Sequence, residues 1–290
     1  MTSRKLLGWL PLLVLPAAAI GCRNQLPAWG FMWSLAFAIY FGLKWLMLCR
    51  ALSKNHTSKM RGAGFLIFWP GMDAEAFLDE EQSVESPRFT SWLSAVLQTA
   101  LGAILIWVVA RMVPSHQALT RGWIGMLGLI LILHFGTFRL VALFWQSIGI
   151  KADPIMFQPL RSTSLAEFWG KRWNIGFREL AHELIFKPLA RSMSANVAGM
   201  AVFLFSGLLH DLVISVPARG GYGLPTLYFV LQGGGVMLQR SGFAKHFGLA
   251  IGMRGWCLTM LFLIAPLFWL FHPYFVLRVI LPFMQAIRAL

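Results

Sequence analysis

The chain has 290 residues, of which 58% are hydrophobic and 12% are charged, and its mean hydropathy is +0.66. A soluble domain with a polar surface contains fewer apolar residues than this, so the composition indicates an integral membrane protein instead. The apolar runs are also too long for a membrane β-barrel, whose strands are short segments of alternating polarity.

Long apolar segments follow one another along the chain. A segment of roughly 20 residues crosses a ~30 Å hydrocarbon core as a helix, and Pro or Gly within it is tolerated. We therefore expect an all-α fold, a polytopic transmembrane helical bundle of about eight spans with interfacial or re-entrant helices, in a single domain over residues 1–290. The expected spans are Leu6 to Ile20, Ala28 to Cys49, Ser91 to Ala110, Trp123 to Ile148, Val197 to Val216, Leu224 to Leu238, Trp256 to Phe271 and Pro273 to Ile287.

The basic residues are placed as in a membrane protein rather than a nucleic-acid-binding protein, although the formal net charge is +14. If the N-terminus is cytoplasmic, the outside segments hold only Arg23, Arg111, Arg121 and Arg219, and most other basic residues lie inside. This is the positive-inside bias. We expect membrane lipids and no nucleic acid as partners, in the bacterial inner (plasma) membrane. We also expect the first span to be retained, although the residues before Cys22 loosely resemble a lipoprotein signal.

The first predicted cytoplasmic loop runs from about Arg50 to Thr90. It contains the apolar stretch FLIFW at Phe65 to Trp69, which is too short to span, followed by PGMD at Pro70 to Asp73. A short apolar stretch in such a loop is typical of an interfacial or re-entrant segment.

The second predicted loop, about Lys151 to Asn196, contains the string FWGKRWN at Phe168 to Asn174. On a helix ending near Pro188, an apolar stripe starts at Trp173 and Asn174 falls at its border. This pattern predicts an interfacial helix. The amide of Asn174 can donate to a developing oxyanion, and Lys171 and Arg172 can engage phosphates, although a basic, Trp-rich helix is more often a membrane anchor.

His210 lies deep within an apolar span, where a histidine is costly unless it has a partner or a task. Burial keeps its ring neutral, so the ring can act as a general base on an alcohol, and Ser206 lies one turn earlier and can orient it. A structural hydrogen bond across helices is the alternative. Asp211 points elsewhere and is interpreted as a buried partner for a basic group such as Arg139.

Other signatures of catalysis are absent from the sequence. The chain has no HExxH, GxSxG, P-loop or paired CxxC motif, and Cys22, Cys49 and Cys257 have no metal or disulfide spacing. We expect no metal. The glycines from Gly233 to Gly235 are interpreted as a site of close helix packing.

Two blocks, SLAEFWGKRWN (Ser164 to Asn174) and FSGLLHD (Phe205 to Asp211), resemble the signatures of the membrane-bound O-acyltransferase superfamily, most closely its wax synthase-like branch. PGMD at Pro70 to Asp73 resembles an upstream wax-synthase element. The resemblance is specific over about residues 154–235. The chain departs from it at Asp211, where many relatives carry Glu.

The resemblance implies that His210 is the catalytic base and Asn174 its essential companion. It implies transfer of an acyl group from a thioester donor, acyl-CoA, to a lipid-phase alcohol, most simply a long-chain alcohol giving a wax ester. Acyl-CoA would be a co-substrate, and no cofactor is expected. Further substrate-binding residues, proposed from residue type, are Phe168, Trp169, Lys171, Arg172, Trp173 and Ser206.

Two alternatives remain open at this point. One is an O-acyltransferase that acts on another lipid, a sugar or a polymer hydroxyl. The other is a membrane transporter in which Arg139, His134, His210 and Asp211 form a polar pathway. A transporter would have no need of FWGKRWN.

Overall fold

The computed structural model describes residues 3–53, 59–81 and 84–290 and contains no strand within them, so the all-α prediction is confirmed. Residues 54–58 and 82–83 of the first predicted loop, including Lys54, lie outside the described residues. The chain divides into two compact units, which we describe separately. Unit 1 comprises residues 1–155 and 277–290, and unit 2 comprises residues 156–276.

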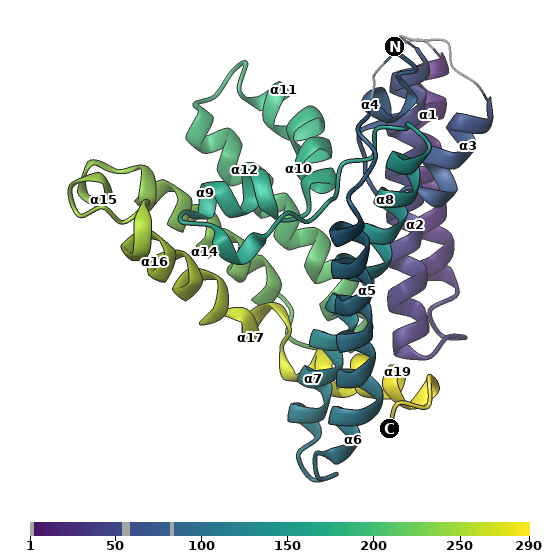
Figure 1. Ribbon diagram of the computed structural model, residues 1–290, viewed down its shortest axis with the longest axis vertical. Coiled ribbons are helices and arrows are strands. Elements are labelled where there is room, and N and C mark those ends of the chain that lie inside the picture. The colour runs from purple at the N-terminus through teal and green to yellow at the C-terminus, as the bar shows by residue number, and fades with distance from the viewer. Residues whose placement is uncertain (1–2, 54–58, 82–83) are drawn as a thin grey trace. The chain divides into compact units, whose positions relative to one another are not determined.

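Unit 1 is built from helices (Figure 1), and several of their turns are π-helical. Its elements are α1 (Ser3–Gly21), α2 (Ala28–Leu52), α3 (Lys59–Phe68), α4 (Ala74–Leu78), α5 (Phe89–Ile104), η1 (Leu105–Val109), α6 (Ala110–Met112), α7 (Ala118–Ile130), η2 (Leu131–Thr137), α8 (Phe138–Ser147), η7 (Val276–Ile280) and α19 (Leu281–Ala286).

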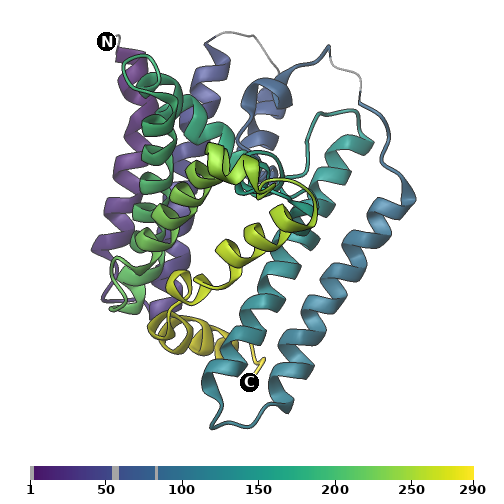
Figure 2. The same ribbon diagram turned by 90° about the vertical axis from the view of Figure 1, so that its left-hand side faces the viewer.

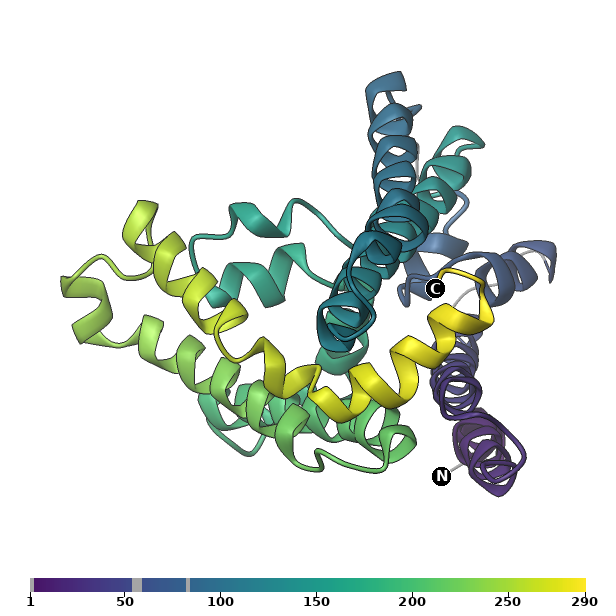
Figure 3. The same cartoon turned by 90° about the horizontal axis from the view of Figure 1, so that it is seen from below.

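Close helix crossings in unit 1 occur at glycines. Helices α1 and α2 lie side by side and are seen nearly end-on in Figure 3. A Cβ at Gly42 of α2 would lie 2.6 Å from the Cα of Leu12 in α1. The run from α7 to α8 lies beside α5 (Figure 2), where a Cβ at Gly102 would lie 2.6 Å from the carbonyl oxygen of Gly128. Small residues at such crossings are typical of helices packed within a membrane.

The PGMD element is anchored by two side chains of α2. The Lys44 ammonium donates to the carbonyl of Gly71 at 2.6 Å, and the Tyr40 hydroxyl donates to the carbonyl of Trp69 at 3.0 Å. Asp73 accepts from the N–H of Ala76 and so caps α4. The FLIFW stretch consists of the end of α3 and the residue after it, Trp69. Phe65 is buried in the core of unit 1, whereas Ile67 and Phe68 are exposed.

Unit 2 carries both signature blocks. Its elements are η3 (Pro159–Arg161), α9 (Leu165–Glu167), η4 (Phe168–Arg172), α10 (Ile175–Ala181), η5 (His182–Phe186), α11 (Lys187–Leu189), α12 (Ala195–His210), η6 (Asp211–Ser215), α13 (Val216–Ala218), α14 (Leu224–Arg240), α15 (Gly242–His246), α16 (Gly252–Ile264), α17 (Leu267–Leu270) and α18 (Pro273–Phe275).

Helices α12 and α14 form the centre of unit 2 and pack closely along their lengths (Figure 1). A Cβ at Gly207 would lie 2.6 Å from the Cα of Thr226, so only glycine fits that crossing. The predicted close packing at the glycine run is confirmed: Gly233 faces Phe203, and Gly235 faces Leu165. Gly234, between them, meets nothing within 4 Å.

Every predicted span lies in a helical part of the structure, but the span count of about eight is not confirmed. Within the described residues, two apolar helices, Leu7–Gly21 and Pro273–Ala286, are shorter than a full span. Helix α14 is also short, with 17 residues. In the part of the chain that the structure describes, five stretches are long and apolar enough to cross a membrane: Ala28–Leu52, Phe89–Met112, Ala118–Ser147, Ala195–Ala218 and Gly252–Leu270.

Candidate active site

Side-chain caps define the start of the first signature block. The Ser164 hydroxyl accepts from the N–H of Glu167 at 3.1 Å, and the Glu167 carboxylate accepts from the N–H of Thr163 at 2.8 Å. This reciprocal arrangement is a variant of the capping box. The hydrogen bond from Thr163, together with the Arg172 guanidinium, holds the pKa of Glu167 below its ordinary value, although burial opposes the shift.

The string FWGKRWN does not continue into the helix that follows it. The π-helical turn η4 ends at Arg172. The backbone of Trp173 is extended, and Asn174 is left-handed with φ 44° and ψ 58°. The Oδ1 atom of Asn174 accepts from the N–H of Phe177 at 3.2 Å and caps α10. The prediction of one helix carrying both Trp173 and the later stripe was therefore wrong. Asn tolerates the left-handed conformation and is a strong N-cap, so the helix breaks at this residue.

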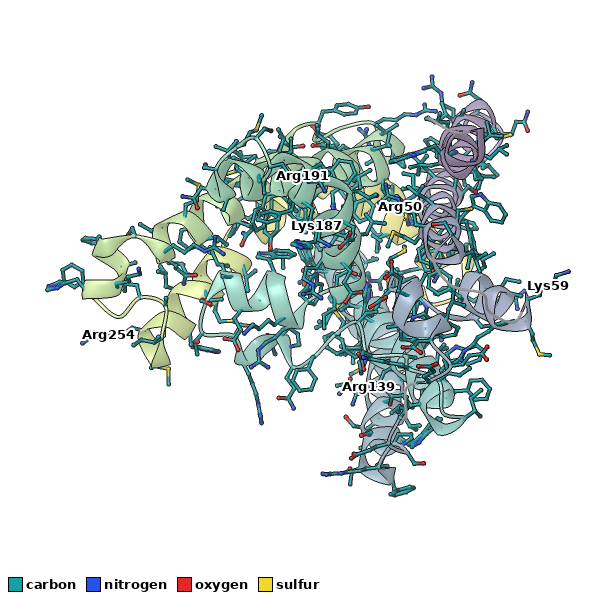
Figure 4. The ribbon with its side chains drawn as sticks, turned by 90° about the horizontal axis from the view of Figure 1, so that it is seen from above. Arg50, Lys59, Arg139, Lys187, Arg191 and Arg254 are labelled. Atoms are coloured by element: carbon teal, nitrogen blue, oxygen red, sulfur yellow. The ribbon has the colours of Figure 1, made fainter. Side chains whose placement is uncertain are left out.

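The two basic residues of the string have different surroundings. Arg172 is engaged within unit 2, because its Nε donates to Glu167 at 2.8 Å and its NH2 group pairs with the same carboxylate at 2.7 Å. Lys171 is exposed and makes no hydrogen bond or ion pair with any described residue. Farther along the same run, Lys187 pairs with Glu183, and Arg191 follows α11 (Figure 4). Of Lys171 and Arg172, Lys171 is therefore the side chain available to bind a phosphate group.

The three aromatic residues of the string, Phe168, Trp169 and Trp173, pack against one another in unit 2, and we call this group the FWGKRWN wall. Trp173 stacks on Phe168, with ring centroids 5.5 Å apart, and Trp169 meets Phe168 edge-on at 4.9 Å. Trp169 also contacts Phe203 of α12. The wall packs against Leu165 and against α14 and α16 in an apolar cluster.

His210 is the last residue of α12 before η6, and π-helical turns are often found at functional sites. Its Nδ1 lies 2.7 Å from the carbonyl oxygen of Ser206. A carbonyl oxygen only accepts, so Nδ1 carries the proton of the neutral ring and Nε2 presents a lone pair. No described residue donates to or accepts from Nε2. Nε2 can therefore accept a proton, and the backbone carbonyl of Ser206 fixes the orientation of the ring.

Phe229 of α14 joins the two signature blocks. Its ring centroid lies 4.4 Å from that of His210 and 5.4 Å from that of Trp169. The structure therefore brings Trp169 and His210 to one aromatic ring. Asn174 lies in the same unit, but its hydrogen bonds go to Met156, Phe177 and Arg178, and none of them goes to His210.

Two buried polar atoms near this ring have no hydrogen-bond partner within the described residues: Nε1 of Trp169 and Oε1 of Gln232. Gln232 lies three residues after Phe229 on α14, is fully buried, and uses its Nε2 to donate to the carbonyl of Phe262 at 2.7 Å. Buried polar groups without partners are rare and require an explanation. The sequence reasoning missed both Phe229 and Gln232. For Gln232 the available signal was an amide within an apolar span.

Asp211 is held by several hydrogen bonds within unit 2. Its carboxylate accepts from the Ser215 hydroxyl at 2.8 Å, from the N–H of Gly223 at 2.8 Å, and from both the N–H and the hydroxyl of Thr226. The donors are thus amides and hydroxyls of unit 2, and the prediction of a basic partner was wrong. The carboxylate anchors the N-terminal end of α14, where an anion is stabilised.

A groove of about 510 Å³ opens beside Asp211 and is lined by Leu208, Tyr222, Leu227 and Val230 among others. His210 is not part of its lining. Within the described residues, no group of three or more His, Cys, Asp or Glu side chains is arranged to hold a metal ion.

The region that holds these residues is similar to part of several known proteins. Residues 152–231, which contain both signature blocks, match the family described as "Membrane bound O-acyl transferase family". "Probable long-chain-alcohol O-fatty-acyltransferase 7" of Arabidopsis thaliana is 28% identical over 142 residues, covering 43% of this chain and 41% of that protein. "Probable long-chain-alcohol O-fatty-acyltransferase 3" of the same plant is 23% identical over 205 residues, covering 65% and 60%.

A third relative has a different alcohol in its name. "Acyl-CoA--sterol O-acyltransferase 1" of Arabidopsis thaliana is 26% identical over 139 residues, covering 43% of this chain and 39% of that protein. The alignments with these three relatives thus span between about two fifths and three fifths of the relatives' own lengths. Together, the family match and these relatives confirm the resemblance of this chain to the membrane-bound O-acyltransferase superfamily and, within it, to the wax synthase-like branch.

Proposed function

We propose that this chain is a membrane-embedded O-acyltransferase that moves an acyl group from acyl-CoA to the hydroxyl of a long-chain alcohol, giving a wax ester. The observation that carries the proposal is the state of His210. Its Nδ1–H is held by the Ser206 carbonyl, so the lone pair of Nε2 is left available beside Phe229 and the FWGKRWN wall. A positioned, neutral imidazole is the usual general base for activating a hydroxyl.

In the first step, Nε2 of His210 takes the proton of the alcohol as the alcohol oxygen attacks the carbonyl carbon of the thioester. A new C–O bond forms, and the carbonyl oxygen becomes an oxyanion. In the second step the C–S bond breaks and the departing sulfur takes the proton from Nε2. The products are an ester and free CoA thiol, and His210 returns to its starting form. The two substrates balance the reaction, so no cofactor is invoked.

The developing oxyanion requires hydrogen-bond donors, which stabilise it most strongly in a site that excludes water. The buried Nε1–H of Trp169 is one candidate, because it has no partner among the described residues. The Nδ2 amide of Asn174 is the other, because only Oδ1 is used in capping α10. Oε1 of Gln232 would accept from the alcohol and help to orient it. Lys171 would bind the phosphates of the donor. Phe168 packs against both Trp169 and Trp173 and would help to hold Trp169 in place.

The donor and acceptor are inferred from chemistry and from the names of relatives. One related protein is named for acyl-CoA and a sterol, and two are named for long-chain alcohols, so an acyl-CoA donor and a lipid alcohol fit the group. A sterol is the nearest alternative acceptor, followed by a sugar or polymer hydroxyl. The relatives described above are acyltransferases by name, which favours an enzyme over a transporter.

We further propose a multi-pass membrane location with the N-terminus in the cytoplasm, on the basis of the positive-inside bias. The exposed side chains of Leu93, Val96, Leu97, Leu101 and Ile104 on α5 suit contact with lipid. The relatives are plant proteins, so they lend no support to our prediction of a bacterial membrane.

The test is ester formation by purified protein in detergent, using labelled long-chain acyl-CoA with hexadecanol, a sterol or glucose as acceptor. We expect hexadecanol to be acylated fastest and His210→Ala to lower kcat by about 10²–10⁴-fold. His246→Ala is the matched control, because His246 is exposed on α15 and outside the site. Undiminished turnover in His210→Ala would reject the base, and no ester from the wild type with any acceptor would reject the function.

A further inference from the structure

The buried imidazole of His272, immediately before α18, is not used by the reaction proposed above. Both His272 and Ser215 have no exposed surface. The Nδ1 atom of His272 accepts from the N–H of Phe275 at 3.2 Å and caps α18. The proton of the neutral ring is therefore on Nε2, which lies 3.2 Å from the Ser215 hydroxyl oxygen. Burial lowers the pKa of His272, although the Asp211 charge opposes the shift, so the neutral ring is favoured.

The hydrogen bonds then run in one direction. His272 donates to Ser215, and Ser215 donates to Oδ1 of Asp211 at 2.8 Å, with the carbonyl of Gly221 at 3.2 Å as a second acceptor. The His272 ring lies against Gly221, where a Cβ would come within 2.5 Å of ring atoms. Gly221 also has φ +72°, a conformation that glycine adopts without strain.

Asp211 connects these hydrogen bonds to the two segments that position His210, the end of α12 and the start of α14. It follows His210 directly in the chain and, through Gly223 and Thr226, it holds the first turn of α14. Phe229, three residues after Thr226, packs on the His210 ring. The end of α12 and the start of α14 are thus tied to one carboxylate whose orientation depends on Ser215 and His272.

We infer that His272 is a positioning residue for His210, acting through Ser215 and Asp211 to hold the imidazole against Phe229 in its reactive orientation. The inference rests on the proposed function. A cap for α18 alone would require only an acceptor, which Asn or Ser supplies. The imidazole is distinguished from those residues because it caps α18 and reaches Ser215 at the same time.

Two substitutions separate these roles. His272→Asn keeps an acceptor at the δ position for the N–H of Phe275 but has no donor that reaches Ser215. His272→Gln places an amide N–H at the ε position and can restore that donor. We expect His272→Asn to lower kcat by about 10–100-fold with KM and melting temperature close to wild type, because small misplacements of a catalytic group have effects of this size. His272→Gln should recover most of the loss.

Carbethoxylation of His210 by diethyl pyrocarbonate, followed by mass spectrometry, tests the orientation without relying on turnover. The rate at Nε2 should change by about threefold or more in His272→Asn and return in His272→Gln, because reactivity follows the exposure and hydrogen bonding of that nitrogen. If His272→Asn is too unstable to purify, Ser215→Ala tests the same link and should show the same loss of kcat. Unchanged kcat and an unchanged carbethoxylation rate would overturn the inference. A wild type without ester formation would reject the proposed function, and the carbethoxylation result would still decide the role of His272.

Discussion

Asn174 has two separable roles in this structure, and substitutions can divide them. Its Oδ1 caps α10, and its backbone is left-handed, whereas its Nδ2 is available to substrate. Asn174→Ala removes the cap, which costs about 1 kcal/mol of unfolding free energy, and places a Cβ without a compensating hydrogen bond in a left-handed backbone, which costs about 1–2 kcal/mol more. The alanine variant would therefore lose about 2–3 kcal/mol of unfolding free energy. A fall in its activity could then come from misfolding as well as from the missing amide.

Asn174→Gly and Asn174→Asp avoid that confusion. Glycine adopts the left-handed conformation freely and lowers cap stability by only a few tenths of a kcal/mol, whereas aspartate keeps the capping oxygen. Both lack the amide donor, so kcat should fall by about 10²–10³-fold in each. Melting can be followed by intrinsic fluorescence of the 13 tryptophans. The alanine variant should melt about 5–10 °C lower than wild type, and the other two close to wild type.

The decisive comparison is the glycine variant. Turnover within about threefold of wild type in a fully folded Asn174→Gly protein would show that the amide plays no part in stabilising the oxyanion, because loss of one such donor has a far larger effect. Asn174 would then be an N-cap only, and Trp169 would remain as the candidate donor.

Three further predictions concern packing, polar satisfaction and pH. Gly207→Ala should destabilise the protein by about 1–3 kcal/mol, because its Cβ would lie 2.6 Å from a Cα of α14, whereas Gly199→Ala in the same helix meets nothing within 4 Å and should leave thermal melting unchanged or slightly raised. Gln232→Met should lower kcat and should lower the melting temperature less than Gln239→Met, because Gln232 has one hydrogen-bond partner, the carbonyl of Phe262, whereas Gln239 has three; equal effects of the two on the melting temperature would contradict this. The pKa of Glu167 is lowered in the folded protein, so the ionised carboxylate stabilises the fold. This stabilisation is fully present above the ordinary pKa of about 4.3 and is lost as the pH falls through the folded pKa. Between about pH 6 and pH 3, the melting temperature of the wild type should therefore fall more than that of Glu167→Gln.

Helices were predictable because their signal is local. Apolar segments of sufficient length determine their own hydrogen bonding in a membrane, where every backbone group must be satisfied within the segment. Every predicted span therefore lies in helical structure. Close packing at Gly233 and Gly235 was also predictable, because it depends on the missing side chain itself.

The sequence by itself determined the helical membrane architecture, the family resemblance and the two blocks with His210 and Asn174 as candidates. Only the tertiary structure decided that the helix breaks at Asn174, that Arg172 is engaged by Glu167, and that Asp211 binds amides and hydroxyls instead of a basic side chain. These outcomes depend on which groups distant segments present to one another. Phe229 illustrates the reason: its phenyl ring has no chemistry readable from sequence, and it became part of the site only because the packing of α12 on α14 placed it between Trp169 and His210.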